Sequence, residues 1–408
     1  MNERSGAHGA LARFFGANIL FAAGLFAHAF LYNFYLESVG AGAALMGGAA
    51  ASLTAGGLVA LVPAGRVVDR HGPGSAYVAG AILAATGLIW SAWVSSPAAV
   101  YATGFLAGAG TSAWRVSMGP GIMRLADERT RSRAFSWNVA LLVASGSVWT
   151  AIAGAAPGWV EARGLGATES LRTALVAGAL LTLIAALALP RRHVRAATAP
   201  TDRGTVRDTA ERASSLPRSF ALVILVVAVW MCAGGLVLPF FNVFFQRAHS
   251  LSIGRIGTIF GAAQLATAAV LALSAEAAAR VGPRRALAAW TVLFAPALLA
   301  LAWAGSPGLA VALYLVAGFV PPATNPLIDQ VLLEDVPPTR HGIVSTWRNG
   351  ATELSGLLGA SIGGILLETT SFAILFSIAG AVAAFGAGTL FIVLRRFDAA
   401  AASAFGRA

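Results

Sequence analysis

The sequence of 408 residues has no lysine and a single cysteine, Cys232, and only 11% of its residues are charged. One cysteine excludes an intramolecular disulfide and a metal site built from thiolates. So few charges cannot cover the surface of a soluble protein, because 57% of the residues are hydrophobic and the mean hydropathy is +0.75. The composition therefore predicts a chain that lies mostly in a lipid bilayer, where helices satisfy their own backbone hydrogen bonds.

The basic residues are 28 arginines, which outnumber the 17 acidic residues and give a formal net charge of +11. In a soluble chain this charge would suggest binding to nucleic acid. Here the arginines lie in short tracts between apolar runs and form no continuous surface, so we interpret them as signals of membrane topology. We expect no nucleic-acid partner.

Apolar runs long enough to cross a hydrocarbon core occur twelve times in the sequence. The first, at about 14–36, is too long and too often interrupted for a cleaved signal peptide, so we expect it in the mature protein. The others lie at approximately 45–65, 75–95, 98–122, 134–157, 171–190, 219–245, 254–276, 286–305, 308–332, 342–367 and 372–394. The predicted fold class is an all-α integral membrane protein with twelve transmembrane helices.

The distribution of arginine orients these spans. If the N-terminus lies inside, the outer loops hold only Arg163, Arg172, Arg247 and Arg255, and nearly all other arginines fall on the cytoplasmic side. The positive-inside rule then places both termini in the cytoplasm. We expect the chain in the cytoplasmic (inner) membrane of a bacterium. The polar, arginine-rich stretch 191–218 is interpreted as a cytoplasmic linker between two six-helix bundles, at 1–190 and 219–408.

The two predicted bundles are related in sequence. Gly24 and Gly234 are 234 − 24 = 210 positions apart, and the same offset pairs many other residues. Examples are Phe30 with Phe240, Gly108 with Gly318, Trp137 with Trp347, Arg70 with Arg280, and Gly72 with Gly282. Because each half has an even number of spans, the halves share one orientation and should be related by an axis along the membrane normal, around a central cleft.

Residues 65–73, between the second and third spans, read Gly-Arg-Val-Val-Asp-Arg-His-Gly-Pro. This segment resembles the G-x-x-x-D-R-x-G loop signature of the major facilitator superfamily, and the twelve spans, the repeat and the long central loop extend the resemblance to the whole chain. It implies a secondary transporter whose cleft is lined by spans one, four, seven and ten. We therefore expect no enzymatic activity, no cofactor and no metal site, since no catalytic cluster is recognisable.

The loop motif predicts a breakable cytoplasmic latch. Gly65 would permit close helix approach, Asp69 would bind a facing helix terminus or an arginine, and Gly72 would allow a tight turn. The candidate latch residues are Gly65, Asp69, Arg70 and Gly72, with Arg280 and Gly282 in the second half. The second copy of the loop motif has Ala279 at the position equivalent to Asp69, so the sequence does not favour a second latch.

Polar side chains inside the spans are the candidates for function, because they are costly in a bilayer unless they are paired or face water. The candidate solute-binding residues are His28, Tyr32, Tyr35, Thr111, Arg115, Asn242, Gln246, Asn325 and Arg348. Asp329 and Glu353 are the candidates for proton coupling or a gate. For Glu353, gain or loss of a proton would change the cost of closing the cleft around it.

Each of these interpretations has an alternative. His28, Tyr32 and Tyr35 share one stripe of the first span, which suits either a cavity wall or helix packing. Arg115 could bind an anionic solute with Thr111, or form an ion pair with a carboxylate of the second half. Glu353 could likewise be held in a structural pair by an arginine.

The sequence thus predicts a secondary active transporter of a small organic solute, coupled to protons, with an anionic moiety weakly favoured by the two deep arginines. One alternative is efflux of amphipathic drugs or metabolites, indicated by Phe240, Phe241, Phe244 and Phe245, although the drug-antiporter signature of the fifth span is not clearly present. The other is a non-transporting membrane sensor or assembly factor. Expected partners are the solute, protons and membrane lipid, with no obligate protein partner.

Overall fold

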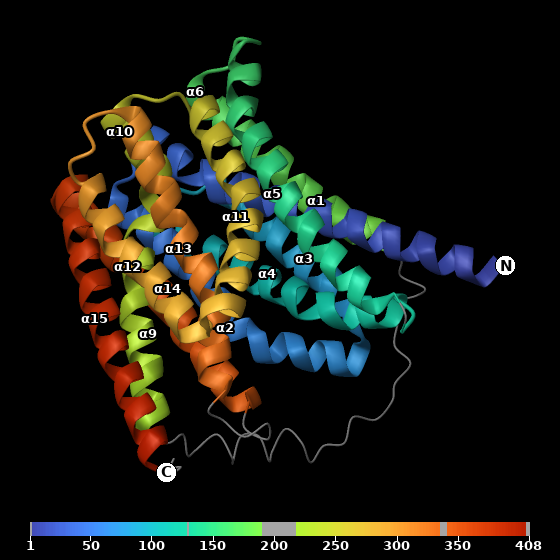
Figure 1. Cartoon of the computed structure of the whole chain (residues 1–408). Coiled ribbons are helices and arrows are strands. Elements are labelled where there is room, and N and C mark those ends of the chain that lie inside the picture. The colour runs from blue at the N-terminus through green and yellow to red at the C-terminus, as the bar shows by residue number, and fades with distance from the viewer. Residues whose placement is uncertain (1, 129, 190–217, 335–340, 405–408) are drawn as a thin grey trace. The chain divides into compact units, whose positions relative to one another are not determined.

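The computed structural model describes residues 2–128, 130–189, 218–334 and 341–404, and this part of the chain is helical throughout, with short turns and no strand (Figure 1). The elements are α1 (Asn2–Ser38), α2 (Ala43–His71), α3 (Pro73–Ser91), α4 (Pro97–Leu125), α5 (Arg131–Glu161), α6 (Ala167–Ala188), α9 (Arg218–Val237), η1 (Leu238–Phe240), α10 (Phe241–His249), α11 (Ile253–Val281), α12 (Pro283–Leu301), α13 (Pro307–Glu334), α14 (His341–Thr369) and α15 (Phe372–Ala404). Since α9, η1 and α10 follow one another without a break, the described residues form the twelve spans that the sequence predicts, and the fold class is confirmed.

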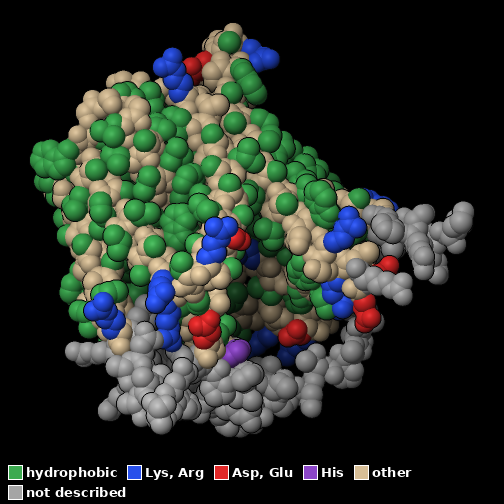
Figure 2. Space-filling view, viewed as in Figure 1, with side chains coloured by type: hydrophobic (Ala, Val, Ile, Leu, Met, Phe, Trp, Pro, Cys, Tyr) green, Lys and Arg blue, Asp and Glu red, His purple; other side chains and the backbone are tan. Residues whose placement is uncertain are grey.

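Eleven of these spans are long and apolar enough to cross a membrane. The exception is α4, which has sufficient length but carries Arg115 and many glycine, serine and threonine residues at its centre. The face shown in Figure 2 is covered mostly by hydrophobic side chains, with few charged side chains among them. Such a surface suits a bilayer, because lipid tails cover the hydrophobic band.

The sequence repeat is visible in the helix bounds. Both bounds of α2 recur at the same offset in α11, and both bounds of α3 recur in α12. The turns recur too: Gly72 and Gly282 have φ angles of 84° and 86°, in the left-handed region that favours glycine. Each of these glycines is followed by a proline at the first position of the next helix.

The described helices group into two compact units. Unit 1 contains α1 to α6 together with Asn242–Ala268, and unit 2 contains α9, the remainder of α11 and α12 to α15. This grouping reports contacts, whereas the predicted division at 1–190 and 219–408 rests on the repeat and stays a prediction. The predicted linker 191–218 lies outside the described residues, apart from Arg218, which begins α9.

Small residues hold α4 tightly against α2 and α3 in unit 1. A Cβ atom at Gly108 would overlap the Leu53 carbonyl of α2, and one at Gly110 would overlap the Ala84 backbone of α3. Membrane helices associate by such close contact, since lipid removes the hydrophobic driving force between them. In unit 2, Gly359 of α14 packs against α9 in the same way, with a Cβ atom there only 2.7 Å from the Gly235 backbone.

Candidate functional site

Three candidate residues of α1 form a stack of rings inside unit 1. The ring centroids of His28 and Tyr32 are 4.3 Å apart, and those of Tyr32 and Tyr35 are 6.1 Å apart. His28 Nε2 lies 3.1 Å from the Ser91 hydroxyl of α3, which donates its own proton to the Leu88 carbonyl at 2.7 Å. Nε2 of His28 is therefore the donor in this pair. All three rings are buried, which favours the helix-packing interpretation; solute binding by them stays a prediction.

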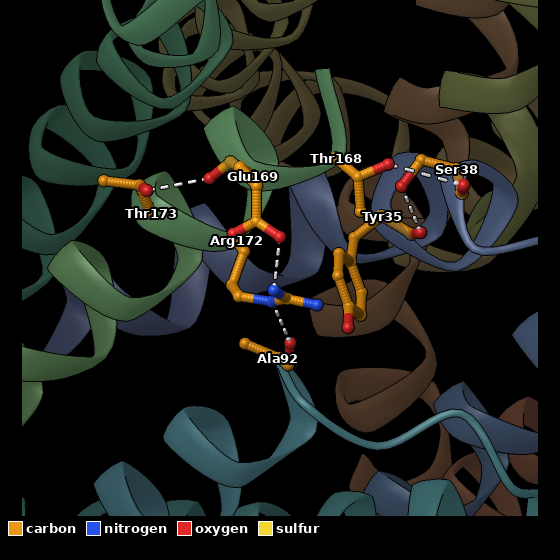
Figure 3. A network of polar contacts seen from close by, with 7 residues as sticks. All are labelled: Tyr35, Ser38, Ala92, Thr168, Glu169, Arg172 and Thr173. Carbon is orange, nitrogen blue, oxygen red and sulfur yellow. Dashed lines mark hydrogen bonds and ion pairs between the residues drawn. The ribbon is translucent and has the colours of Figure 1, made fainter. Parts of the chain in front are cut away.

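Arg172 of α6 connects the ends of three helices at one end of this stack (Figure 3). Its Nε atom donates to the Ala92 carbonyl after α3 at 2.9 Å, and a terminal nitrogen donates to Glu169 at 2.5 Å. The guanidinium carbon also lies 6.0 Å from the centre of the Tyr35 ring. The sequence identified Arg172 only as an outer loop charge, because nothing in the spacing predicts its neighbours.

Asn242 links α10 to α1, both within unit 1. Its amide nitrogen donates to the Phe30 carbonyl at 2.9 Å, and its oxygen accepts from Asn33 at 3.2 Å. Arg247, one turn and a half further along α10, forms a 2.7 Å ion pair with Glu37. The amide of Asn242 is thus engaged by α1 here. Sequence reasoning missed Asn33, since it lies off the stripe that contains the three rings.

The other candidates of unit 1 differ in how they are engaged. The Thr111 hydroxyl donates to the Ala107 carbonyl of its own helix at 2.9 Å. Arg115 has an exposed side chain on α4. The side-chain oxygen of Gln246 is buried and accepts no hydrogen bond within the described part of the chain. A buried acceptor without a hydrogen bond is unusual, so Gln246 stays a good candidate for contact with a solute.

A neutral polar network joins α1, α4 and α5 in the core of unit 1. Asn18 donates to Asn138 at 2.8 Å and accepts from the Trp114 indole at 3.0 Å. Asn138 also directs its amide at the Met118 sulfur, 3.8 Å away. The Trp114 ring stacks on Phe21 with centroids 4.3 Å apart. All polar atoms of this network have partners, so it stabilises the bundle without charge.

Arg348 forms a charged network in unit 2. One terminal nitrogen donates to the carbonyl and the side-chain oxygen of Asn325, at 3.1 and 2.8 Å, and the other donates to Asn349 at 2.7 Å. Its Nε atom lies 3.2 Å from a carboxylate oxygen of Asp329. The side chain of Arg348 is only 7% exposed, against 43% for Asp329. Three of the predicted residues are thereby brought together, while Glu353 lies half-buried further along α14.

The loop motif occupies the end of α2. Gly72 directly follows α2 and donates its N–H to the Val68 carbonyl at 2.9 Å, as the predicted turn requires. Asp69 and Arg70 are exposed, and a Cβ atom at Gly65 would meet nothing within 4 Å. The close helix approach expected at Gly65 is thus not formed in this structure, and the latch stays a prediction.

The second copy of the motif has its own arrangement. Gly282 donates its N–H to the Ala278 carbonyl at 2.9 Å, which repeats the turn of the first copy. Arg280 forms an exposed ion pair with Glu276 of its own helix at 2.8 Å. No group of three or more histidine, cysteine or acidic side chains that could hold a metal occurs among the residues described.

Comparisons with known proteins relate this chain to transporters. The sequence profile of the Major Facilitator Superfamily matches residues 14–249 and 222–407. No curated protein matches the sequence. The fold is similar to the nucleoside transporter NupG, with a TM-score of 0.76, 15% identity and coverage of 94% of this chain and 99% of that chain.

Two further solved structures are similar. A bacterial homologue of the iron transporter ferroportin, in an inward-facing state, has a TM-score of 0.73 and 13% identity, over 94% of this chain and 98% of that chain. A D-xylose-proton symporter has a TM-score of 0.67 and 13% identity, over 93% and 96%. At these identities the likeness shows the fold alone.

Proposed function

This chain belongs to the Major Facilitator Superfamily, a family of membrane transporters, and we propose that it moves a small organic solute by alternating access with proton coupling. We further propose that it lies in the cytoplasmic membrane of a bacterium with both termini inside, because the arginines are concentrated on one side. Membership of a transporter family weighs against both a non-transporting sensor and an enzyme.

The observation that carries the proposal is the ion pair between Arg348 and Asp329 inside the membrane span of unit 2. Charged side chains within apolar spans are costly and mark solute or proton pathways by default. Asp329 lies five residues before the end of α13, about 8 Å from it at the helical rise per residue. Its carboxylate is also partly exposed, so a proton can reach it.

Proton transfer to Asp329 would remove its attraction to Arg348. The guanidinium would then keep only its bonds to the two asparagines, Asn325 and Asn349, and could turn toward another anion or acceptor. This exchange couples the protonation of α13 to the polar contacts of α14, as a proton-driven carrier requires. Glu353 is the second candidate for the same role.

The solute class follows from the donors and acceptors that the candidates offer. Gln246 and Asn325 present amides, and Arg115 and Arg348 present guanidinium groups, which suit hydroxyl-rich or anionic organic molecules. The similar solved structures include a nucleoside transporter and a D-xylose-proton symporter, which supports nucleosides and sugars as the first solutes to test. Short organic acids complete the panel, because of the arginines.

The test is uptake by proteoliposomes with an imposed proton gradient. We expect wild-type protein to accumulate one of these solutes and to acidify or alkalinise the lumen in step with it. The Asp329→Asn variant should lose accumulation but retain exchange of internal for external solute. Glu276→Gln, which removes a carboxylate from an exposed ion pair, is the matched control and should behave as wild type.

Two outcomes would contradict the proposal. Accumulation of a solute without any movement of protons would exclude proton coupling, whereas transport would stand. Full accumulation by both Asp329→Asn and Glu353→Gln would exclude these carboxylates as the coupling groups.

A further inference from the structure

A groove of about 390 Å³ lies between α12 and α15, within unit 2. Its floor includes the buried side chains of Leu287, Thr291 and Leu390, and its rim includes the exposed side chains of Val292 and Phe391. Thr291 contributes the one polar side-chain group of this lining, and its hydroxyl is buried and donates to the Leu287 carbonyl at 2.9 Å. The groove therefore suits a purely apolar occupant.

Basic side chains mark one end of this groove. Arg285 lies three residues before Ala288, which lines the groove, and so shares its helix face. Arg395 lies over the ring of Phe391, with its guanidinium carbon 4.2 Å from the ring centre. Both arginines are exposed. On the left of Figure 2, over α12 and α15, basic side chains lie at the lower end of a mostly hydrophobic surface.

The positions of the two arginines match the anatomy of a bilayer leaflet. Arg285 lies in the first turn of α12, and Arg395 lies two residues after Val393, where the apolar span of α15 ends. Both are thus at headgroup depth, while the groove extends from them into the hydrocarbon region. The arginine distribution predicts the cytoplasmic leaflet at this end, and a negatively charged leaflet surface attracts basic side chains there.

We propose that the groove between α12 and α15 binds an anionic phospholipid. One acyl chain fills the groove, and the phosphate accepts hydrogen bonds from Arg285 and Arg395. The acyl chain makes apolar contacts that any lipid could make, and the two guanidinium groups supply the preference for a negatively charged headgroup. The volume is in the range of about 300–1,000 Å³ that specific small-ligand sites occupy.

Native mass spectrometry of the purified full-length protein tests the headgroup contact. The protein is mixed with equal amounts of phosphatidylglycerol and phosphatidylcholine of identical chains. We expect retention of phosphatidylglycerol to exceed that of phosphatidylcholine roughly tenfold or more, given two arginines at the membrane surface. Arg285→Gln with Arg395→Gln should abolish this preference, and Arg395→Lys should largely keep it. Arg163→Gln, an exposed arginine at the other end of the spans, is the control.

A groove-filling variant tests the acyl chain contact. A Cβ atom at Gly388, on the lining, would meet nothing within 4 Å, so Gly388→Leu can fill the groove without backbone strain. It should reduce retention of both lipids, whereas Ala381→Leu, exposed on the same helix outside the groove, should not. A monodisperse elution profile on size-exclusion chromatography confirms that the variants are folded.

Three results would overturn the proposal. Equal retention of the two lipids by wild type would show that the groove binds lipid without a preference for a charged headgroup. Unchanged retention in Gly388→Leu would place the lipid elsewhere. Binding of glycerol phosphate, which has no acyl chains, with the same affinity as the lipid would show a simple anion site.

Discussion

Asn138 in unit 1 and Arg348 in unit 2 occupy equivalent positions of the repeat, on α5 and α14, but they link their helices by different chemistry. Asn138 bonds to Asn18 and directs its amide at Met118 of α4, without any charge. Arg348 bonds to Asn325 and pairs with Asp329, both on α13, which is the equivalent of α4. A neutral link can only hold a bundle together, whereas a charged link can be broken by a proton.

Glycine packing also differs between equivalent positions. At Gly108 in unit 1 a Cβ atom would overlap the Leu53 backbone, whereas at Gly318 in unit 2 the nearest atom would lie 3.9 Å away. Gly24 and Gly234 differ in the same way, with overlap at Gly24 and 3.5 Å at Gly234. At these positions unit 1 is tightly packed and neutral, while unit 2 is looser and holds the charged link.

The largest effect on this comparison should come from breaking the charged link. Arg348→Ala leaves the Asp329 carboxylate without its partner, and we expect it to lower the free energy of unfolding by about 3 kcal/mol. This value is at the low end for a broken buried ion pair, because Asp329 is partly exposed. Thermal unfolding of the detergent-solubilised protein measures it. Adding Asp329→Asn should recover most of the loss; an additive double variant would show that the pair is not coupled.

A smaller effect is expected where glycine packing differs. Gly108→Ala should cost about 2 kcal/mol, because the added methyl group meets the rigid backbone of α2. Gly318→Ala, its partner in the repeat, should change stability by less than about 0.5 kcal/mol. Melting temperatures of the two variants compare them directly. Equal losses would mean that the packing of the two halves is alike.

The neutral link should be weaker than the charged one. Asn138→Ala removes one hydrogen bond to Asn18 and should cost about 1 kcal/mol. Replacing Asn18 by leucine as well should cost more, because the buried indole N–H of Trp114 then loses its acceptor. Thermal unfolding again reports the effect. A loss in Asn138→Ala equal to that of Arg348→Ala would remove the distinction between the two links.

The smallest effect is expected for an ion pair that is charged but exposed. Arg247 and Glu37 form an ion pair in unit 1, but their side chains are 39% and 29% exposed. Arg247→Gln should therefore cost about 0.5 kcal/mol or less, and the loss should shrink further as salt is added. Unfolding at low and high ionic strength measures this. A loss that is large and independent of salt would show that this pair behaves as a buried one.

Local pattern was sufficient to predict the fold. Hydrophobic length gave the twelve spans, the offset of 210 positions gave equivalent helices, and the motif gave the turn at Gly72, which the φ angle confirms. The partners of site residues were not predictable in this way. Ser91, which bonds to His28, lies on another helix, and sequence spacing does not say which helices are neighbours. Asn33, which bonds to Asn242, lies on α1 but off the stripe that contains the three rings.

The low hydropathy of α4 has a consequence for how the protein is made. An arginine at the centre of a span opposes entry into the bilayer by about 2.5–3.5 kcal/mol, and Arg115 lies four residues past the midpoint of α4, in a helix rich in glycine, serine and threonine. The glycines that fit α4 against α2 and α3 provide the missing stabilisation, but only once those helices are in place. Insertion of α4 therefore depends on helices synthesised before it, and a ribosome-bound chain that ends at α4 without them would leave this segment outside the membrane.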